Sequence, residues 1–223
     1  MSSIANMLTL IVQRPATPNR RVTDAATRMF HWLFALSFLG AYLTSDGERW
    51  RHIHITLGYT MIGLLAARLF WGLIGPKRSR LSALVQKAKA ISPWLRQCRS
   101  ASSWHTMNWQ LPQQALTAML VMVLLFATIP LVLSGYLTDI DFAGEFMEEL
   151  HEWMGNFYLM TVLAHIGLLM IFSVLRRKNL ASPMLSGYTA GAGPDLVKQN
   201  HVIVAFCLLA CTLAWWVWSL ALS

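Results

Sequence analysis

Charged residues are scarce in this chain. Asp, Glu, Lys and Arg make up 13% of its 223 residues, whereas a typical soluble domain carries about 25%. Hydrophobic residues make up 56%, and the mean hydropathy is +0.47. The ten Trp and ten Phe residues suit the aromatic belts found at the two faces of a bilayer. The composition therefore excludes an ordinary soluble domain and predicts an integral membrane protein.

Cysteine is also scarce, with only Cys98, Cys207 and Cys211 in the sequence. They form neither a C-x-x-C pair nor a C-x-x-C-H sequence, which argues against a zinc ribbon and against a covalently attached c-type haem. Cys207 and Cys211 lie one helical turn apart in an apolar segment, where such residues usually serve packing.

Five apolar segments can cross a bilayer, and none has the alternating pattern of a membrane-spanning strand. A spanning helix needs about 20 residues, and helices are the expected spanning element. The third segment contains Pro130, which is expected to kink it. The predicted spans are residues 29–43, 53–74, 116–137, 153–175 and 202–222.

The sign of the charged residues differs between the segments that connect the predicted spans. Lys and Arg cluster in segments 1–28, 76–112 and 176–200, whereas residues 139–152 contain six acids and no Lys or Arg. Because positive residues mark the cytoplasmic side, we expect the N-terminus inside and the C-terminus outside. The net charge of +8 then reflects topology and contact with anionic membrane lipids, and we expect no nucleic-acid partner.

Four of the seven histidines lie in spans or at their ends, where ionisable side chains are costly and usually functional. The other three, His52, His105 and His201, are expected to be surface or interfacial residues. His151 and His165 are 14 residues apart. On one helix they therefore lie roughly 40° apart around the axis and about 21 Å apart along it.

Chain direction sorts these four histidines into two levels: His54 with His151 near the outer face, and His31 with His165 near the inner face. Two imidazoles from facing helices suit the two axial positions of a haem b iron. Zinc would want about four ligands at each level, and a proton relay would favour carboxylates between the histidines. A single transmembrane histidine is more often a packing residue, so a haem-free transporter or membrane anchor is an alternative.

Glycines and arginines accompany these histidines. Gly58 and Gly155 each lie four residues after an outer histidine, on the stripe where a porphyrin would approach the helix. Arg68 lies 14 residues after the outer histidine of its own span, and Arg28 one turn before the inner histidine of the first span. Either arginine could pair with the propionates of an inner haem. Alternatively, Arg68 extends to the inner headgroups.

Four stretches carry a resemblance to a known family: "TRMFHWLFALSFLGAYLT", "HITLGYTMIGLLAARLFWGLIGPKRSRL", "IPLVLSGYLT" and "ELHEWMGNFYLMTVLAHI". Together they lie within residues 27–170, and they resemble the bacterial cytochrome b561 family, which includes the b-type cytochrome subunits of nickel–iron hydrogenases. The resemblance implies a bacterial inner-membrane protein whose four-helix core holds two haems b, with His31, His54, His151 and His165 as axial ligands. It also implies electron exchange with the quinone pool (ubiquinone or menaquinone), with a quinone bound at some stage.

The expected fold class is an all-α integral membrane bundle with a four-helix haem-binding core and a fifth, C-terminal transmembrane helix. The fifth span and the long basic segment between the second and third spans depart from the smallest family members. Within that basic segment, residues 81–98 are expected to lie on the inner leaflet as a helix bent at Pro93, and residues 179–196 are expected to be loop. The expected divisions are a cytoplasmic segment 1–28 that can contain an interfacial helix, the di-haem core 29–175 with a cytoplasmic amphipathic segment 76–112, a cytoplasmic loop 176–200, and the fifth helix 201–223.

Two functions follow from this reading. The first is an electron relay between quinone and a periplasmic redox protein, such as a c-type cytochrome, docked on the acidic outer loop. The alternative is an enzyme that oxidises superoxide at the outer face and reduces quinone, with Arg49 and Arg51 attracting the anion. The sequence does not decide whether the chain is an enzyme or an electron-transfer protein.

Overall fold

The computed structural model describes residues 19–77, 79–100 and 108–221. This part of the chain is mostly helical, in agreement with the predicted all-α class. Each predicted span corresponds to one long helix. These helices are α2 (Ala25–Leu43), α3 (Arg51–Ile74), α6 (Gln110–Asp139), α7 (Glu145–Leu175) and α9 (Val202–Ala221).

Four helical stretches among the described residues are long and apolar enough to cross a membrane: Glu48–Ile74, Gln110–Asp139, Glu145–Leu175 and Val202–Ala221. The first of these joins the short 3-10 helix η1 (Glu48–Trp50) to α3. The predicted first span, α2, is not one of the four, because Arg28 and His31 in its first two turns lower its hydropathy. Its role as a fifth span stays a prediction.

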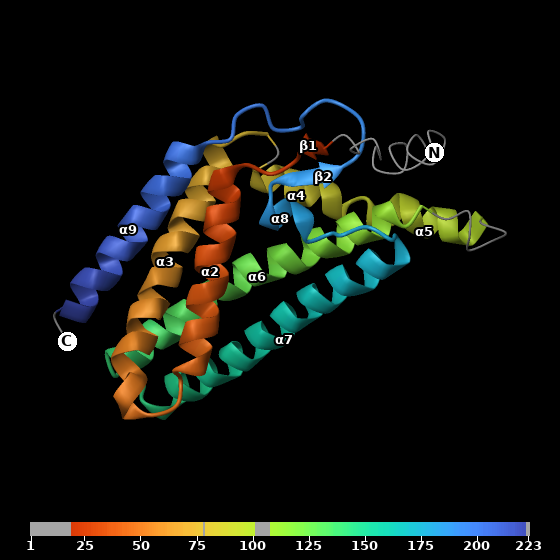
Figure 1. Ribbon diagram of the computed structural model, residues 1–223. Helices are drawn as coiled ribbons and strands as arrows, with labels where there is room; N and C mark the ends of the chain where they lie inside the picture. Colours follow the sequence, from red (N-terminus) through yellow and green to blue (C-terminus); the bar gives the residue numbers. More distant parts are fainter. Residues whose placement is uncertain (1–18, 78, 101–107, 222–223) are drawn as a thin grey trace, which may run out of the picture.

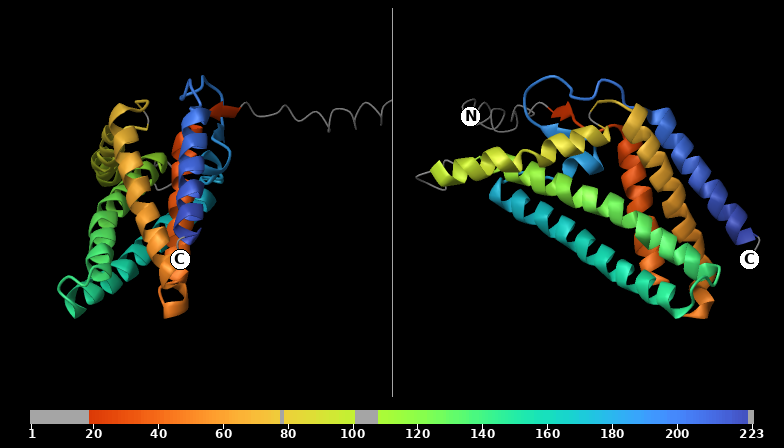
Figure 2. Two further views of the ribbon diagram at one scale, coloured as in Figure 1. Left: turned by 90° about the vertical axis from the view of Figure 1, so that its left-hand side faces the viewer. Right: turned by 180° about the vertical axis from the view of Figure 1, so that it is seen from behind.

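The five long helices form two groups. α2, α3 and α9 lie side by side, and α6 and α7 form an antiparallel pair inclined to them (Figures 1 and 2). The α2–α3 connection lies at the same end of the bundle as the α6–α7 connection, while both strands and α4 lie at the opposite end (Figure 1). This arrangement separates the acidic segment 139–152 from the basic segments.

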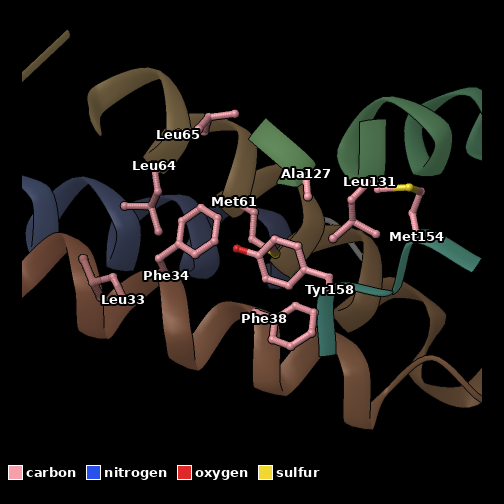
Figure 3. Packing of buried hydrophobic residues seen from close by; sticks show 10 residues of the cluster. All are labelled: Leu33, Phe34, Phe38, Met61, Leu64, Leu65, Ala127, Leu131, Met154 and Tyr158. Carbon is pink, nitrogen blue, oxygen red and sulfur yellow. The ribbon is translucent and has the colours of Figure 1, made fainter. Parts of the chain in front are cut away.

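The hydrophobic core lies where the two groups meet, and it draws on four helices. Figure 3 shows Tyr158 of α7 pointing into this cluster towards Phe38 of α2 and Met61 of α3. The ring centroids of Tyr158 and Phe38 are 4.7 Å apart. The other members are Leu33, Phe34, Leu64, Leu65, Ala127, Leu131 and Met154.

The C-terminal helix α9 is joined to α3 by hydrogen bonds as well as by apolar contact. Trp216 Nε1 donates to Thr60 Oγ1 (2.9 Å), and the hydroxyls of Thr56 and Ser219 are 2.8 Å apart. Small polar side chains commonly link helices in this way within a bilayer. The fifth helix is therefore an integrated part of the bundle.

A buried polar cluster fixes the start of α2, and we call it the polar clasp (Asp24, Thr27, Arg68 and Ser79). The Asp24 carboxylate is fully buried. It accepts hydrogen bonds from Thr27 N (2.6 Å) as the N-cap of α2 and from Ser79 Oγ (2.7 Å). Arg68 Nη1 donates to the Ser79 carbonyl (3.0 Å). The clasp thereby ties the end of α3 and the loop after it to the first turn of α2.

The predicted loop 179–196 is not entirely loop, so that prediction was wrong in part. It contains the short helix α8 (Ser182–Leu185) and the strand β2 (Tyr188–Ala190), which pairs antiparallel with β1 (Asn19–Arg21). Arg21 Nη2 donates to the Tyr188 hydroxyl (2.8 Å), which helps to hold the two strands together. Since β1 lies far away in the sequence, local Gly, Pro and Ser content could not reveal this pairing.

The predicted helix over residues 81–98 is divided differently from the prediction. It forms α4 (Leu81–Ala88) and α5 (Ile91–Ser100), and the break falls at Lys89–Ala90, ahead of Pro93. Pro93 lies in the first turn of α5, where backbone N–H groups have no partner within the helix. Its missing N–H therefore costs nothing there, and Pro93 does not bend the helix.

Replacing Asp24 with Ala should destabilise the fold strongly. The change removes the N-cap of α2 and a buried hydrogen bond to a carboxylate, a loss of about 2–4 kcal/mol. Thermal unfolding of the detergent-solubilised protein, followed by circular dichroism, measures it. Glu149→Ala removes an exposed carboxylate and serves as the control. Equal melting temperatures for the two variants would contradict a stabilising clasp.

Candidate functional site

The structure brings His54 of α3 and His151 of α7 close together at one end of the bundle. Their ring centroids are 5.8 Å apart, and the ring planes are perpendicular. An imidazole nitrogen binds a metal at about 2 Å and lies roughly 1 Å from its ring centre, so two imidazoles on opposite sides of one metal have centres about 6 Å apart. The observed spacing fits an axial ligand pair.

Backbone carbonyls of neighbouring helices hold both of these rings. His54 Nδ1 donates to the Ala41 carbonyl of α2 (2.8 Å), and His151 Nδ1 donates to the Leu131 carbonyl of α6 (3.0 Å). A carbonyl oxygen only accepts, so Nδ1 carries the proton in each ring and Nε2 keeps its lone pair. This tautomer is the one in which Nε2 binds a metal and the hydrogen bond orients the ring.

The acceptor on α2 is accessible for a local reason. Ala41 lies in the last turn of α2, which ends at Leu43. Its carbonyl accepts from Thr44 N (3.2 Å), three residues later, and has no N–H partner four residues later, so it can also accept from the ring of His54. The end of α2 therefore fixes where the ring of His54 can anchor.

The second histidine pair lies nearer the other end of the bundle. His31 of α2 and His165 of α7 are close enough for their charges to interact. His165 Nδ1 is buried and has no hydrogen-bond partner among the described residues. A buried polar atom without a partner is costly, and such an atom is common where a ligand completes the site. The ring of His165 therefore differs from those of His54 and His151, because no carbonyl holds its Nδ1.

An apolar layer separates the two histidine pairs. Tyr158 lies seven residues from His151 and seven from His165, so it sits midway between them on nearly the same face of α7. Its ring packs against Phe38, and its hydroxyl lies 3.3 Å from Thr128 Oγ1. The core of the bundle is therefore also the layer between the two candidate centres.

Open space lies beside Gly58 and Gly155, the two glycines predicted to let a porphyrin approach the helix. A Cβ added to either would meet no atom within 4 Å. The same holds for Gly63 and Gly167, which are not near the outer histidines in the sequence. Space for a side chain therefore exists beside Gly58 and Gly155, but this space does not by itself identify a site, and their role stays a prediction.

Both predicted propionate partners lie at the end of the bundle that holds the strands, where each donates to a carbonyl. Arg68 is buried in the polar clasp, at 8% exposure, with its guanidinium over the ring of Phe30. It therefore does not extend to the headgroups, as the alternative reading required. Arg28 Nη1 donates to the Leu185 carbonyl (3.1 Å), while Arg28 Nε is buried with no partner among the described residues. Arg28 thus keeps a donor for a further acceptor.

The donor set limits which metal group could bind. Within the described ranges, no three His, Cys, Asp or Glu side chains gather to hold a metal ion. Each level offers two imidazoles, so a metal there needs its remaining ligands from elsewhere, and a porphyrin supplies four. The donor set fits haem better than it fits zinc.

An apolar groove of about 530 Å³ lies elsewhere, between α6 and α7. Its lining includes Met119, Met122 and Phe126 of α6 and Phe157 of α7. The lining includes no histidine, and its apolar side chains suit lipid hydrocarbon.

The remaining histidines have separate surroundings. His52 Nε2 lies 2.9 Å from the Ser219 carbonyl, so His52 helps to dock α9. The His201 ring packs against Trp71, with centroids 5.1 Å apart. His105 lies outside the described residues.

Four further residues contact the outer histidines, and sequence reasoning assigned none of them a role. They are Ala41, Leu131, Ser134 and Gly135. The last three lie in the stretch "IPLVLSGYLT", which carried part of the family resemblance. That resemblance was the one available signal, because a backbone acceptor has no side-chain signature.

Paired imidazoles on facing helices of an apolar bundle are the arrangement expected of a membrane-bound b-type cytochrome. A family model described as prokaryotic cytochrome b561 matches residues 22–187. The chain therefore belongs to the prokaryotic cytochrome b561 family, which makes it a haem-binding membrane protein of electron transfer. No curated protein and no solved structure matches it.

Filling the open space beside the outer histidines should prevent haem binding there. Gly58→Leu and Gly155→Leu each place a large side chain where a porphyrin would lie, so each variant should retain about one haem per chain in a pyridine haemochrome assay. Gly63→Leu, at an exposed position on α3, is the control. If Gly58→Leu and Gly155→Leu both keep the full haem content, these glycines do not border the haem.

Proposed function

We propose that this chain holds two haems b and relays electrons across the membrane between the quinone pool and a redox partner at the outer face. His54 and His151 bind the outer haem, and His31 and His165 bind the inner one. The observation that carries the proposal is the pair of outer imidazoles, 5.8 Å apart, each with its Nδ1 held by a carbonyl of another helix.

Bound haem would supply an iron that takes up and releases one electron at a time. The chain would contribute two imidazoles to each haem, and an iron held in this way would have no position left for oxygen or substrate. Its apolar layer of Phe38, Met61 and Tyr158 keeps water out of the space between the two sites. This combination favours an electron relay over chemistry on a bound substrate.

The charge distribution supports the proposed orientation. The described basic residues of 76–112, together with β1 and β2, lie at one end of the bundle, and the acidic α6–α7 connection lies at the other (Figure 1). By the positive-inside rule, the first end faces the cytoplasm, α2 is a fifth span, and the C-terminus is outside. The inner centre then lies near the cytoplasmic face, and the protein belongs in the bacterial inner membrane.

The outer end offers an acidic surface for a partner. Asp141, Glu145, Glu148 and Glu149 are exposed there, and a basic redox protein such as a c-type cytochrome would be attracted to them. Glu145 and Glu148 also lie in the first turn of α7, where carboxylates favour the helix dipole. The quinone, ubiquinone or menaquinone, is proposed from the family alone.

The superoxide-oxidising alternative has less support. Its cationic attractor would be Arg49 and Arg51. Arg51 forms an ion pair with Asp139 (3.1 Å), and the Arg49 guanidinium lies over the ring of Trp50. Both cations are thus engaged, and the exposed acids nearby would repel an anion. Quinone reduction by superoxide without any protein partner would nevertheless favour the enzyme.

Haem quantitation on histidine variants tests the proposal. Wild-type protein should contain two haems per chain, and His151→Ala and His165→Ala should each contain about one, because each change removes one axial ligand. A dithionite-reduced spectrum of each variant identifies which band is lost. His52→Ala is the control and should keep both haems. A colourless wild-type protein would favour the haem-free anchor.

Neutralising the outer acids should slow electron delivery to a basic acceptor. In Glu148→Gln/Glu149→Gln, the rate of reduction of a soluble basic c-type cytochrome should fall several-fold at low salt, and its salt dependence should flatten. Asp195→Asn removes a charge at the opposite end and should change neither. If the double variant matches wild type at every ionic strength, this surface is not the docking site.

A further inference from the structure

We propose that Gly135 of α6 is a positioning residue for the outer haem, because it leaves the gap into which the ring of His151 fits. The proposal rests on the proposed function, since it assigns a role in holding a haem ligand. It concerns a residue on a helix that supplies no ligand of its own.

A side chain at position 135 would collide with the imidazole of His151. A Cβ added to Gly135 would lie 2.7 Å from Cε1 of His151, 3.0 Å from Nδ1 and 3.4 Å from Nε2. Side chains essentially never approach a Cβ to 2.7 Å, so the Cε1–Nδ1 edge of the imidazole occupies the space that any other residue would fill.

The surrounding groups hold the ring in this gap. The Leu131 carbonyl, one turn before Gly135, accepts from His151 Nδ1 (3.0 Å). Ser134 Oγ lies 3.3 Å from the same Nδ1 and donates to the same carbonyl (3.0 Å). Residues 131, 134 and 135 share one face of α6.

The other close glycines of the spanning helices differ in what they face. A Cβ at Gly40 would meet the end of the Leu57 side chain (2.7 Å). A Cβ at Gly72 would come closest to the Leu81 side chain (2.8 Å) and would lie 3.2 Å from Arg68 Nη1. Leucine is flexible and can move aside. An imidazole is a rigid ring, and here its Nδ1 is already tied to α6, so it cannot move away without breaking that hydrogen bond.

A displaced ring would no longer serve as an axial ligand. Its hydrogen bond fixes the direction of Nε2, and the facing ring of His54 is tied to α2. A methyl group at position 135 would therefore push His151 out of line with His54 or break its bond to Leu131. The inner pair does not contact Gly135 and should be unaffected.

Gly135→Ala in the full-length protein tests this inference. We expect the variant to retain about one haem per chain, or to keep two with a shifted low-spin ferric signal in electron paramagnetic resonance and a changed midpoint potential of the outer centre alone. Gly63→Ala and Gly167→Ala are matched controls, because their added methyl groups meet nothing within 4 Å. Both controls should keep the wild-type haem content, signals and potentials.

The double variant Gly135→Ala/His151→Ala separates positioning from general packing. If Gly135 acts only through His151, the double variant should have the same haem content and inner-centre spectrum as His151→Ala. A wild-type spectrum in Gly135→Ala, or the loss of both haems, would overturn the inference. Either of these results for Gly135→Ala would leave the proposed function intact, because each is judged against a wild-type protein with two haems. A wild-type protein without haem would contradict both the proposed function and this inference.

Discussion

An imidazole inside a lipid bilayer needs an acceptor for its N–H, and that requirement organises the outer centre. The acceptors are backbone carbonyls, Ala41 on α2 and Leu131 on α6. Each histidine is thus held by a helix other than its own, so the position of the pair depends on the register of four helices. The site is therefore a property of the assembled bundle.

The spacing of residues along the helices extends this arrangement across the membrane. On α7, His151, Tyr158 and His165 follow at intervals of seven residues, about two helical turns. On α2, Phe38 follows His31 by the same interval, and its ring meets that of Tyr158 at mid-bundle. One packed aromatic layer thus lies between two histidine layers. The same side chains stabilise the fold and lie between the two histidine pairs.

The sequence predicted the parts of this design that depend on position along one helix. The fourteen-residue interval gave the two levels, and charge distribution gave the ends of the bundle. It could not reveal which carbonyl meets which ring, because that depends on the register between helices. For the same reason the Gly135 contact, the pairing of β1 with β2 and the polar clasp around Asp24 were missed. From its helix face, Arg68 was predicted either to pair with a propionate or to extend to the headgroups. Its contacts with Ser79 and Phe30 depend on tertiary packing, so the sequence could not reveal them.

The most direct test of this account is to locate iron in the intact protein. Anomalous diffraction collected at the iron absorption edge from crystals of the haem-loaded protein gives iron positions independently of any haem assay. The account predicts two iron peaks, one between His54 and His151 and one between His31 and His165, on either side of the layer that contains Tyr158. A single peak, no peak, or iron bound by other side chains would contradict it.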